Sequence, residues 1–276
     1  MSLPTLLVRL DLGRSNAGLL KVVGDVAERL GAAVVGAVAC QPVQMLYGDG
    51  FLAAEVIEQD RAEIDQDIAK AEAEFQAVLR GRAQGLEWRS LVTFGPLCEF
   101  FTREARCADL VVTGPALPAP LFDTARHVDV GDLVMQCGRP VLVVPAEAAG
   151  LPLKQALVGW KDTRETRRAL MDAVPVLQKA EQVMVAEVVH EPDGAAARGR
   201  LADVARWLAR HGIEAETRTV KSRGEDAERL SALAAEINAD LIVAGAYGHS
   251  RMRELVLGGV TYDLLLRASR CALLSH

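Results

Sequence analysis

The sequence predicts an α/β protein made of two tandem doubly wound parallel-sheet domains. Apolar runs rich in Val, Leu and Ile alternate with amphipathic segments, as expected for parallel strands that helices cover on both faces. The second half of the chain repeats the first. The 276 residues, half of them hydrophobic and a quarter charged, provide enough chain for two cores in domains of about 100–150 residues each.

The internal repeat consists of segments of the two halves that match at two offsets in residue number. Residues 108–114 match residues 239–245 at an offset of 240 − 109 = 131, and residues 132–134 match residues 263–265 at the same offset. Upstream, Leu7 matches Leu157 at an offset of 157 − 7 = 150. The first copy therefore carries 150 − 131 = 19 additional residues, which we place from Gln41 to about Asp60.

In the first copy, the spacing of apolar residues predicts five strands and four helices. A strand at 6–10 precedes a helix at 16–30, whose apolar side chains recur at helical spacing and which Gly31 ends. Residues 55–80 form a long amphipathic helix, charged on one face. The other predicted elements are strands at 33–39, 87–93, 110–113 and 141–144 and helices at 97–105 and 132–136.

The second copy repeats this order after a linker from Pro145 to Pro152, which gives domains of residues 1–147 and 153–276. Open parallel sheets bind ligands beyond the carboxyl ends of the strands, where the winding reverses. The relevant loops of the second copy are residues 160–163 and the loop that begins at Gly245. The predicted strands are 156–159, 182–189, 214–220, 241–244 and 272–274, and the helices are 163–177, 195–210, 227–238 and 261–266.

The most informative motif is the glycine loop that follows the apolar run 240–244. Gly245, Gly248 and Gly258 are spaced G-x2-G-x9-G. Glycine tolerates positive φ and removes side chains that would keep a backbone N–H from a phosphate. The spacing matches neither the dinucleotide fingerprint nor the P-loop. It therefore predicts a nucleotide or phosphate site of another kind.

This spacing resembles the G-x2-G-x9-G-[S/T] loop of the universal stress protein family, whose ATP-binding members resemble an adenine-nucleotide α-hydrolase fold. The resemblance covers nearly the whole chain, as a tandem member of two domains. It implies that the second copy holds ATP, with or without Mg²⁺, and that strands 140–145 and 271–275 pair as a pseudo-dimer within one chain. The predicted nucleotide-binding residues are Trp160, Lys161, Asp162, Gly245, Gly248, His249, Arg251, Gly258, Gly259, Val260 and Thr261.

Two positions of the second copy depart from the pattern that the resemblance implies. Gly259 stands where the family has Ser or Thr, so a hydroxyl ligand is missing, and Thr261 compensates only in part. The first strand of the family commonly ends in an Asp that contacts the nucleotide. Here Lys161 takes that place, opposite Asp11 of the first copy, and bulky Trp160 is expected at the mouth of the site.

The first copy lacks the glycine loop. At the 131-residue offset, Leu117 and His127 replace the second and third glycines, and Val128 takes the hydroxyl position. Pro118 and Pro120 contribute no amide donors. We therefore expect the first half to have lost phosphate binding and to serve as a structural partner of the second.

Composition and motif searches exclude several classes of function. A net charge of −6 disfavours a nucleic-acid surface, and no apolar run has the roughly 18–20 residues needed to span a bilayer. Five scattered cysteines and the lack of a secretory leader predict reduced thiols in the cytoplasm. No zinc-ligand spacing and no nucleophile elbow occurs, so we expect no metal site and at most slow ATP hydrolysis.

Two functions from different classes remain open. One is a stress-response signalling or protective module that binds ATP in its C-terminal domain and presents an altered surface to a protein partner. The alternative is a structural or interaction pseudo-dimer that binds no nucleotide and retains a vestigial loop. The sequence does not decide between them, and it leaves further association into a homodimer open.

Overall fold

The computed structural model describes residues 3–43, 54–115, 128–190, 194–223, 226–246 and 269–276. The predicted alternation of strands and helices is confirmed along these ranges, whereas the helix predicted at 261–266 lies outside them. The N-terminal half comprises β1 (Thr5–Arg9), α1 (Ala17–Leu30), β2 (Ala33–Cys40), α2 (Ala54–Leu79), β3 (Leu86–Val92), α3 (Leu97–Glu104), the short 3₁₀ turn η1 (Ala105–Cys107), β4 (Leu110–Thr113), α4 (Val130–Gln136) and β5 (Val141–Val143).

The C-terminal half has the same order of elements from its first strand to its fourth, and a fifth strand follows the undescribed residues 247–268. Its strands and helices are β6 (Gln155–Trp160), α5 (Arg164–Leu177), β7 (Gln182–Val189), α6 (Gly194–Arg210), β8 (Ala215–Lys221), α7 (Asp226–Glu236), β9 (Leu241–Gly245) and β10 (Cys271–Ser275).

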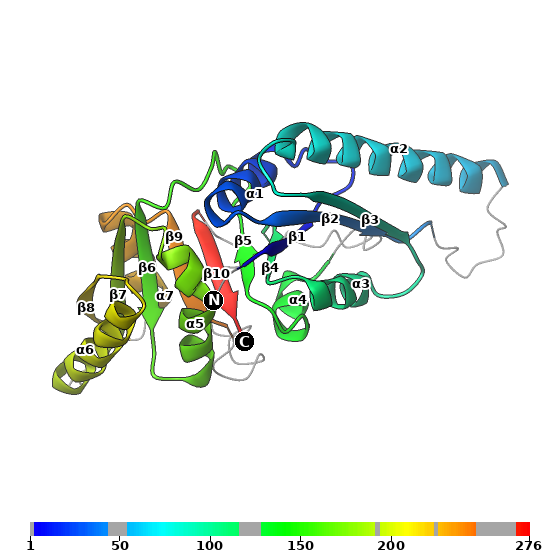
Figure 1. Ribbon diagram of the computed structural model, residues 1–276. Helices are drawn as coiled ribbons and strands as arrows, with labels where there is room; N and C mark the ends of the chain where they lie inside the picture. Colours follow the sequence, from blue (N-terminus) through cyan, green and yellow to red (C-terminus); the bar gives the residue numbers. More distant parts are fainter. Residues whose placement is uncertain (1–2, 44–53, 116–127, 191–193, 224–225, 247–268) are drawn as a thin grey trace.

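One continuous ten-stranded sheet joins the two halves, in the order β3-β2-β1-β4-β5-β10-β9-β6-β7-β8 (Figure 1). Every neighbouring pair is parallel except β5 and β10, which run antiparallel with Leu142 opposite Leu273. The last strand of each half therefore forms the seam. This confirms the predicted pseudo-dimer within one chain.

The register of the sheet explains the repeat seen in the sequence. Leu6 lies opposite Leu110 in the N-terminal half, and Ala156 lies opposite Leu241 in the C-terminal half. In each half an aspartate before the fourth strand accepts a backbone N–H at the start of the first strand. The Oδ2 of Asp109 accepts from Thr5 at 3.0 Å, and the Oδ2 of Asp240 accepts from Lys154 at 2.8 Å. The repeated Ala-Asp-Leu segment is thus a structural element.

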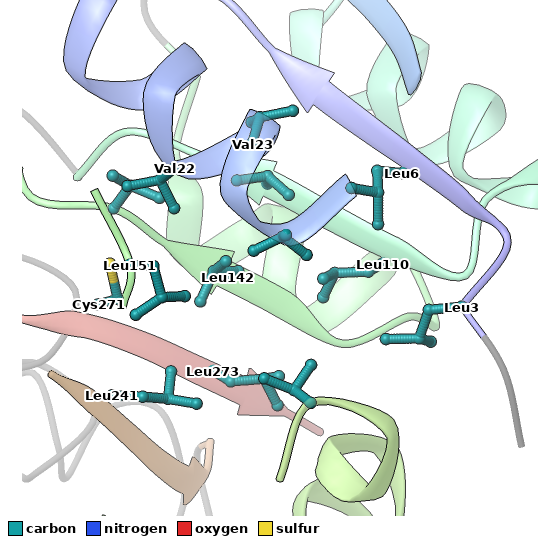
Figure 2. Packing of buried hydrophobic residues seen from close by; sticks show 14 of the residues in the cluster. Leu3, Leu6, Val22, Val23, Leu110, Leu142, Leu151, Leu241, Cys271 and Leu273 are labelled. Atoms are coloured by element: carbon teal, nitrogen blue, oxygen red, sulfur yellow. The ribbon is translucent and has the colours of Figure 1, made fainter. Parts of the chain in front are cut away.

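Two hydrophobic layers cover the sheet. Buried residues of α1, α2, α5 and α6 pack on one face, and those of α3, α4 and α7 pack on the other. The first layer is continuous across the seam. Figure 2 shows Leu142 of β5 and Leu273 of β10 in this layer, together with Leu151 from the segment that connects the halves.

That connecting segment is packed against α1. Leu151 and Leu153 are buried, the N–H of Leu151 donates to Asp25 Oδ2 at 2.7 Å, and Arg29 donates to the Leu151 carbonyl at 2.7 Å. Composition predicted a linker here. The structure shows a linker that is fixed to the first helix of the N-terminal half.

Some of the additional residues of the first copy lie in a helix. Helix α2 has 26 residues, whereas its counterpart α6 has 17. The expected insertion from Gln41 to about Asp60 therefore includes the first turns of α2, because the chain is helical from Ala54. Residues 44–53 lie outside the described ranges.

Candidate functional site

The strand order of the C-terminal half reverses between β6 and β9, which are neighbours in the sheet. Gly159 and Ala244 lie opposite each other near the carboxyl ends of these strands. The next residues are Trp160, which ends β6, and Gly245, which ends β9. The loops that follow β6 and β9 thus flank the position where open α/β sheets bind ligands.

Gly245 ends β9 directly against the start of α5. A Cβ atom at this position would lie 2.6 Å from the backbone nitrogen of Thr166 and 2.7 Å from the carbonyl carbon of Glu165. Real Cβ atoms do not approach backbone atoms this closely. Glycine is therefore required here so that the first turn of α5 can cover the end of β9.

The next residue of the loop is held by the carboxyl end of the chain. The N–H of Ala246 donates to the carbonyl of Ser275 at 2.8 Å, and Nδ1 of His276 lies 3.2 Å from the carbonyl oxygen of Ala246. Ala246 is fully buried. The sequence placed Ser275 in the last strand but did not indicate that Ser275 or His276 contacts the glycine loop, because that contact depends on the parallel pairing of β9 and β10.

The loop after β6 carries charge at the amino terminus of α5. The hydroxyl of Thr163 caps the helix by accepting from the N–H of Thr166 at 3.4 Å. Asp162 pairs with Arg167 at 2.7 Å, while Lys161 is exposed beside it. Two of the predicted site residues, Lys161 and Asp162, thus follow the end of β6, and Gly245 is the last residue of the neighbouring strand β9.

Glu165 is a buried carboxylate in the first turn of α5. Burial by itself raises the pKa of this group, but hydrogen bonds from the Arg164 guanidinium, its own backbone N–H and the Thr163 hydroxyl lower the pKa below its ordinary value. Glu165 is therefore ionised at neutral pH. A carboxylate near a helix amino terminus also interacts favourably with the helix dipole.

Trp160 requires a correction, because it is a core residue. Its side chain is only 8% exposed and belongs to the same hydrophobic cluster as Val158 and Leu201. It lies opposite Glu187, which forms an ion pair with Arg200 of α6. The indole is thus buried between the sheet and its helices rather than placed at the mouth of the site.

The other predicted site residues fall in the range 247–268, which the structure does not describe. They are Gly248, His249, Arg251, Gly258, Gly259, Val260 and Thr261. Their assignment remains a prediction from the sequence.

One further pair at this end of the sheet was not predicted. His190, which follows β7, has its Nε2 3.7 Å from Oδ1 of Asp226 at the start of α7. The sequence places His190 at the end of a strand, but nothing in it indicates Asp226 as a neighbour. The pair borders the carboxyl ends of β7 and β8.

The described ranges contain neither a disulfide nor a cluster of residues that could bind a metal ion. All five cysteines are free, and burial raises the pKa of Cys98, Cys137 and Cys271, that of Cys271 to about 12. In the same ranges, no group of three His, Cys, Asp or Glu residues could hold a metal ion. No described helix combines the length and apolar character that crossing a membrane requires.

Asp172, on the third turn of α5, gives a pH-dependent prediction. Burial raises its pKa above the ordinary 3.8, and the Ser275 hydroxyl and Arg168 offset this only in part. The folded state thus binds the proton of Asp172 more tightly than the unfolded state does. The ionised carboxylate therefore lowers the free energy of unfolding above the folded pKa, and this effect is absent below 3.8. We expect Asp172→Asn to stabilise the protein by about 0.5–1 kcal/mol at neutral pH, with the gain disappearing on acidification.

Urea unfolding of wild type and Asp172→Asn between pH 3.5 and 7.5 measures this effect. Asp203→Asn is a matched control, because the Asp203 side chain is 71% exposed on α6. A gain of equal size at every pH would show that charge burial is not its cause.

Comparisons with known proteins agree with this fold. Residues 152–274 match the model of the Universal stress protein family. A solved universal stress protein from Archaeoglobus fulgidus DSM 4304 superposes with a TM-score of 0.75 at 15% identity, covering 98% of this chain and 95% of that one. No match to this sequence is found among curated proteins.

Two further solved structures span both halves. A functionally unknown protein, PA1789 from Pseudomonas aeruginosa PAO1, has a TM-score of 0.61 at 12% identity over 99% of this chain and 92% of that one. A putative universal stress protein from Pseudomonas aeruginosa UCBPP-PA14 has a TM-score of 0.59 at 14% identity over 99% and 93%. At these identities the superpositions show the shared fold. Residues 152–274 thus belong to the universal stress protein family, and the chain as a whole has the fold of solved two-domain structures of that kind.

Proposed function

We propose that the C-terminal half binds ATP beyond the carboxyl ends of β6 and β9. The observation that carries this proposal is the position of Gly245. It is the first glycine of the G-x2-G-x9-G spacing, and it lies at the point where the strand order reverses, packed against the start of α5. Loops with this chemistry in this place hold phosphates through backbone N–H groups.

The charges beside Gly245 favour the phosphate end of the nucleotide. Lys161 adds a positive charge at the end of β6, where Asp11 stands in the other half. Since ATP carries several negative charges, a cation here supports binding of its phosphates more than recognition of its adenine. We therefore propose that phosphate contacts supply most of the affinity.

We propose that hydrolysis is slow or absent and that Mg²⁺ arrives bound to the phosphates. An available carboxylate is a common means both of activating water and of binding Mg²⁺ directly. Asp162 is the carboxylate that follows β6, and its ion pair with Arg167 at 2.7 Å competes with either role. This arrangement suits a module that responds to bound nucleotide.

The proposed module works through a protein partner that senses the nucleotide-bound surface. Its proposed compartment is the cytoplasm, a reducing environment that suits five free thiols. The second candidate is a pseudo-dimer that binds no nucleotide. Lys161 and Gly259 favour it, because they remove the acidic and hydroxyl groups that the family pattern provides.

Calorimetric titration of the nucleotide-free protein with ATP, with Mg²⁺ and with EDTA, tests the proposal. We expect micromolar affinity in wild type and its loss in Gly248→Trp, which places a large side chain in the glycine loop. Gly199→Trp is the control, because Gly199 is exposed on α6 with no atom within 4 Å of an added Cβ. Absence of heat from wild type at millimolar ATP would contradict nucleotide binding and favour the second candidate.

A further inference from the structure

The N-terminal half carries a buried arginine in the crevice that corresponds to the proposed ATP site. The strand order of this half reverses between β1 and β4. Arg9 is the last residue of β1, and its partner across the strands is Thr113, the last residue of β4. In the C-terminal half the corresponding pair is Gly159 and Ala244. The first half thus places a charged side chain where the second half has none.

The guanidinium of Arg9 is matched by two oxygen acceptors. Its side chain is 5% exposed, Nε donates to Oγ1 of Thr113 at 2.7 Å, and Nη1 donates to Oδ1 of Asp11 at 2.7 Å. A buried charge is costly unless a partner of opposite charge and good geometry accompanies it. Asp11 is that partner, and the short distances are typical of charge-assisted hydrogen bonds.

The loop between β1 and α1 holds Asp11 in place. The N–H of Asp11 donates to Oδ1 of Asn16 at 2.9 Å, and Nδ2 of Asn16 donates back to the Asp11 carbonyl at 3.0 Å. Glu74 of α2 accepts from the N–H of Asn16 at 3.0 Å. The carboxylate that faces Arg9 is therefore fixed by backbone hydrogen bonds on its own residue.

Gly114 completes the surroundings of this ion pair. A Cβ at Gly114 would lie 3.7 Å from Oδ2 of Asp11 and 3.9 Å from Nη2 of Arg9, which are ordinary contact distances. In the C-terminal half, the start of α5 occupies the equivalent space against Gly245. The neighbours of the glycine after the fourth strand thus differ between the halves: a helix start beside Gly245 and a charged pair beside Gly114.

We propose that the N-terminal half contains a guanidinium-binding site that the chain fills with its own Arg9. The oxygens of Asp11 and Thr113 form the site, and Arg9 is its internal occupant. Because Arg9 lies at the ends of β1 and β4 and neutralises Asp11, the N-terminal half is closed to nucleotide. The chain accordingly offers one nucleotide site rather than two. The guanidinium site itself does not depend on ATP binding in the other half.

Chemical rescue tests this site. Arg9→Ala leaves a carboxylate and a hydroxyl facing the space that the guanidinium vacates, so its melting temperature should fall by about 5–10 °C. Millimolar guanidinium chloride should then raise the melting temperature of Arg9→Ala, because an ion that binds only the folded state stabilises it. Sodium chloride of equal ionic strength should not, and wild type should gain nothing.

Arg200→Ala is the matched control. Arg200 pairs with Glu187 in the C-terminal half, but its side chain is 35% exposed, so water can replace it. Equal responses to guanidinium in Arg9→Ala, Arg200→Ala and wild type would overturn the proposal, as would an unchanged melting temperature for Arg9→Ala.

A second set of variants serves if Arg9→Ala does not fold. Arg9→Gln, Asp11→Asn and their combination form a double-mutant cycle, in which coupled losses are expected and additive losses would overturn the ion pair. Stoichiometry adds an independent check. Binding of two ATP molecules per wild-type chain would contradict a closed N-terminal half. Binding of none would contradict the proposed function of the C-terminal half, and the guanidinium rescue of Arg9→Ala would then decide the N-terminal site.

Discussion

Gly245→Ala should destabilise the protein by about 1–3 kcal/mol and weaken ATP binding. The added methyl group would lie 2.6 Å from the nitrogen of Thr166 and 2.7 Å from the carbonyl carbon of Glu165. Both are backbone atoms, so no side-chain rotation can relieve the clash. The first turn of α5 or the end of β9 must move, and either shift displaces the start of the glycine loop. Urea unfolding and calorimetric titration with ATP measure the two effects.

The repeat supplies a matched control for this change. Gly114 occupies the corresponding position in the N-terminal half, where an added Cβ would meet atoms at 3.7 and 3.9 Å. Gly114→Ala should therefore leave both stability and ATP affinity close to wild type. Equal losses in the two variants would show that α5 does not impose the requirement for glycine at position 245.

Leu273→Ala should cost about 2–5 kcal/mol, the largest loss that we expect from removing a single side chain at the seam. Leu273 is fully buried on β10, lies opposite Leu142 of β5 and belongs to the layer that crosses from one half to the other (Figure 2). The truncation leaves a cavity between strands from both halves. Urea unfolding followed by circular dichroism measures the loss.

Leu91→Ala is the corresponding control, because Leu91 is half-buried on the edge strand β3. Its truncation should cost clearly less than that of Leu273. If the two variants lost equal stability, the seam would not be the tightly packed joint that the structure describes.

The sequence predicted the fold well where the pattern is local or repeated. Strand β4 and strand β7 have the predicted bounds, and the match of Asp109 with Asp240 identified two residues with the same structural role. The helix predicted at 55–80 corresponds to α2, and the two repeat offsets placed the extra residues of the first copy before and within its first turns.

The candidate site was predicted less completely, because its contacts join residues far apart in the chain. Hydrogen bonding of Arg9 to Thr113 spans 104 positions and depends on the register of β1 against β4. The burial of Trp160 depends on which face of β6 the α5 and α6 helices cover. A single sequence carries neither kind of information. The position of Gly245 at the end of a strand could be predicted, because a spacing of glycines after an apolar run is a local signal.

Because β5 and β10 are antiparallel, the carboxyl ends of the parallel strands lie along one side of the sheet in the N-terminal half and along the opposite side in the C-terminal half. The ends of β1 and β4, with the self-filled Arg9 crevice, are on one side, and the ends of β6 and β9, with the proposed ATP site, are on the other. Val43, which follows the carboxyl end of β2, and Ala54, which begins α2, belong to the first side. A partner that recognises the bound nucleotide and a partner that recognises the start of α2 would therefore approach the molecule from different directions.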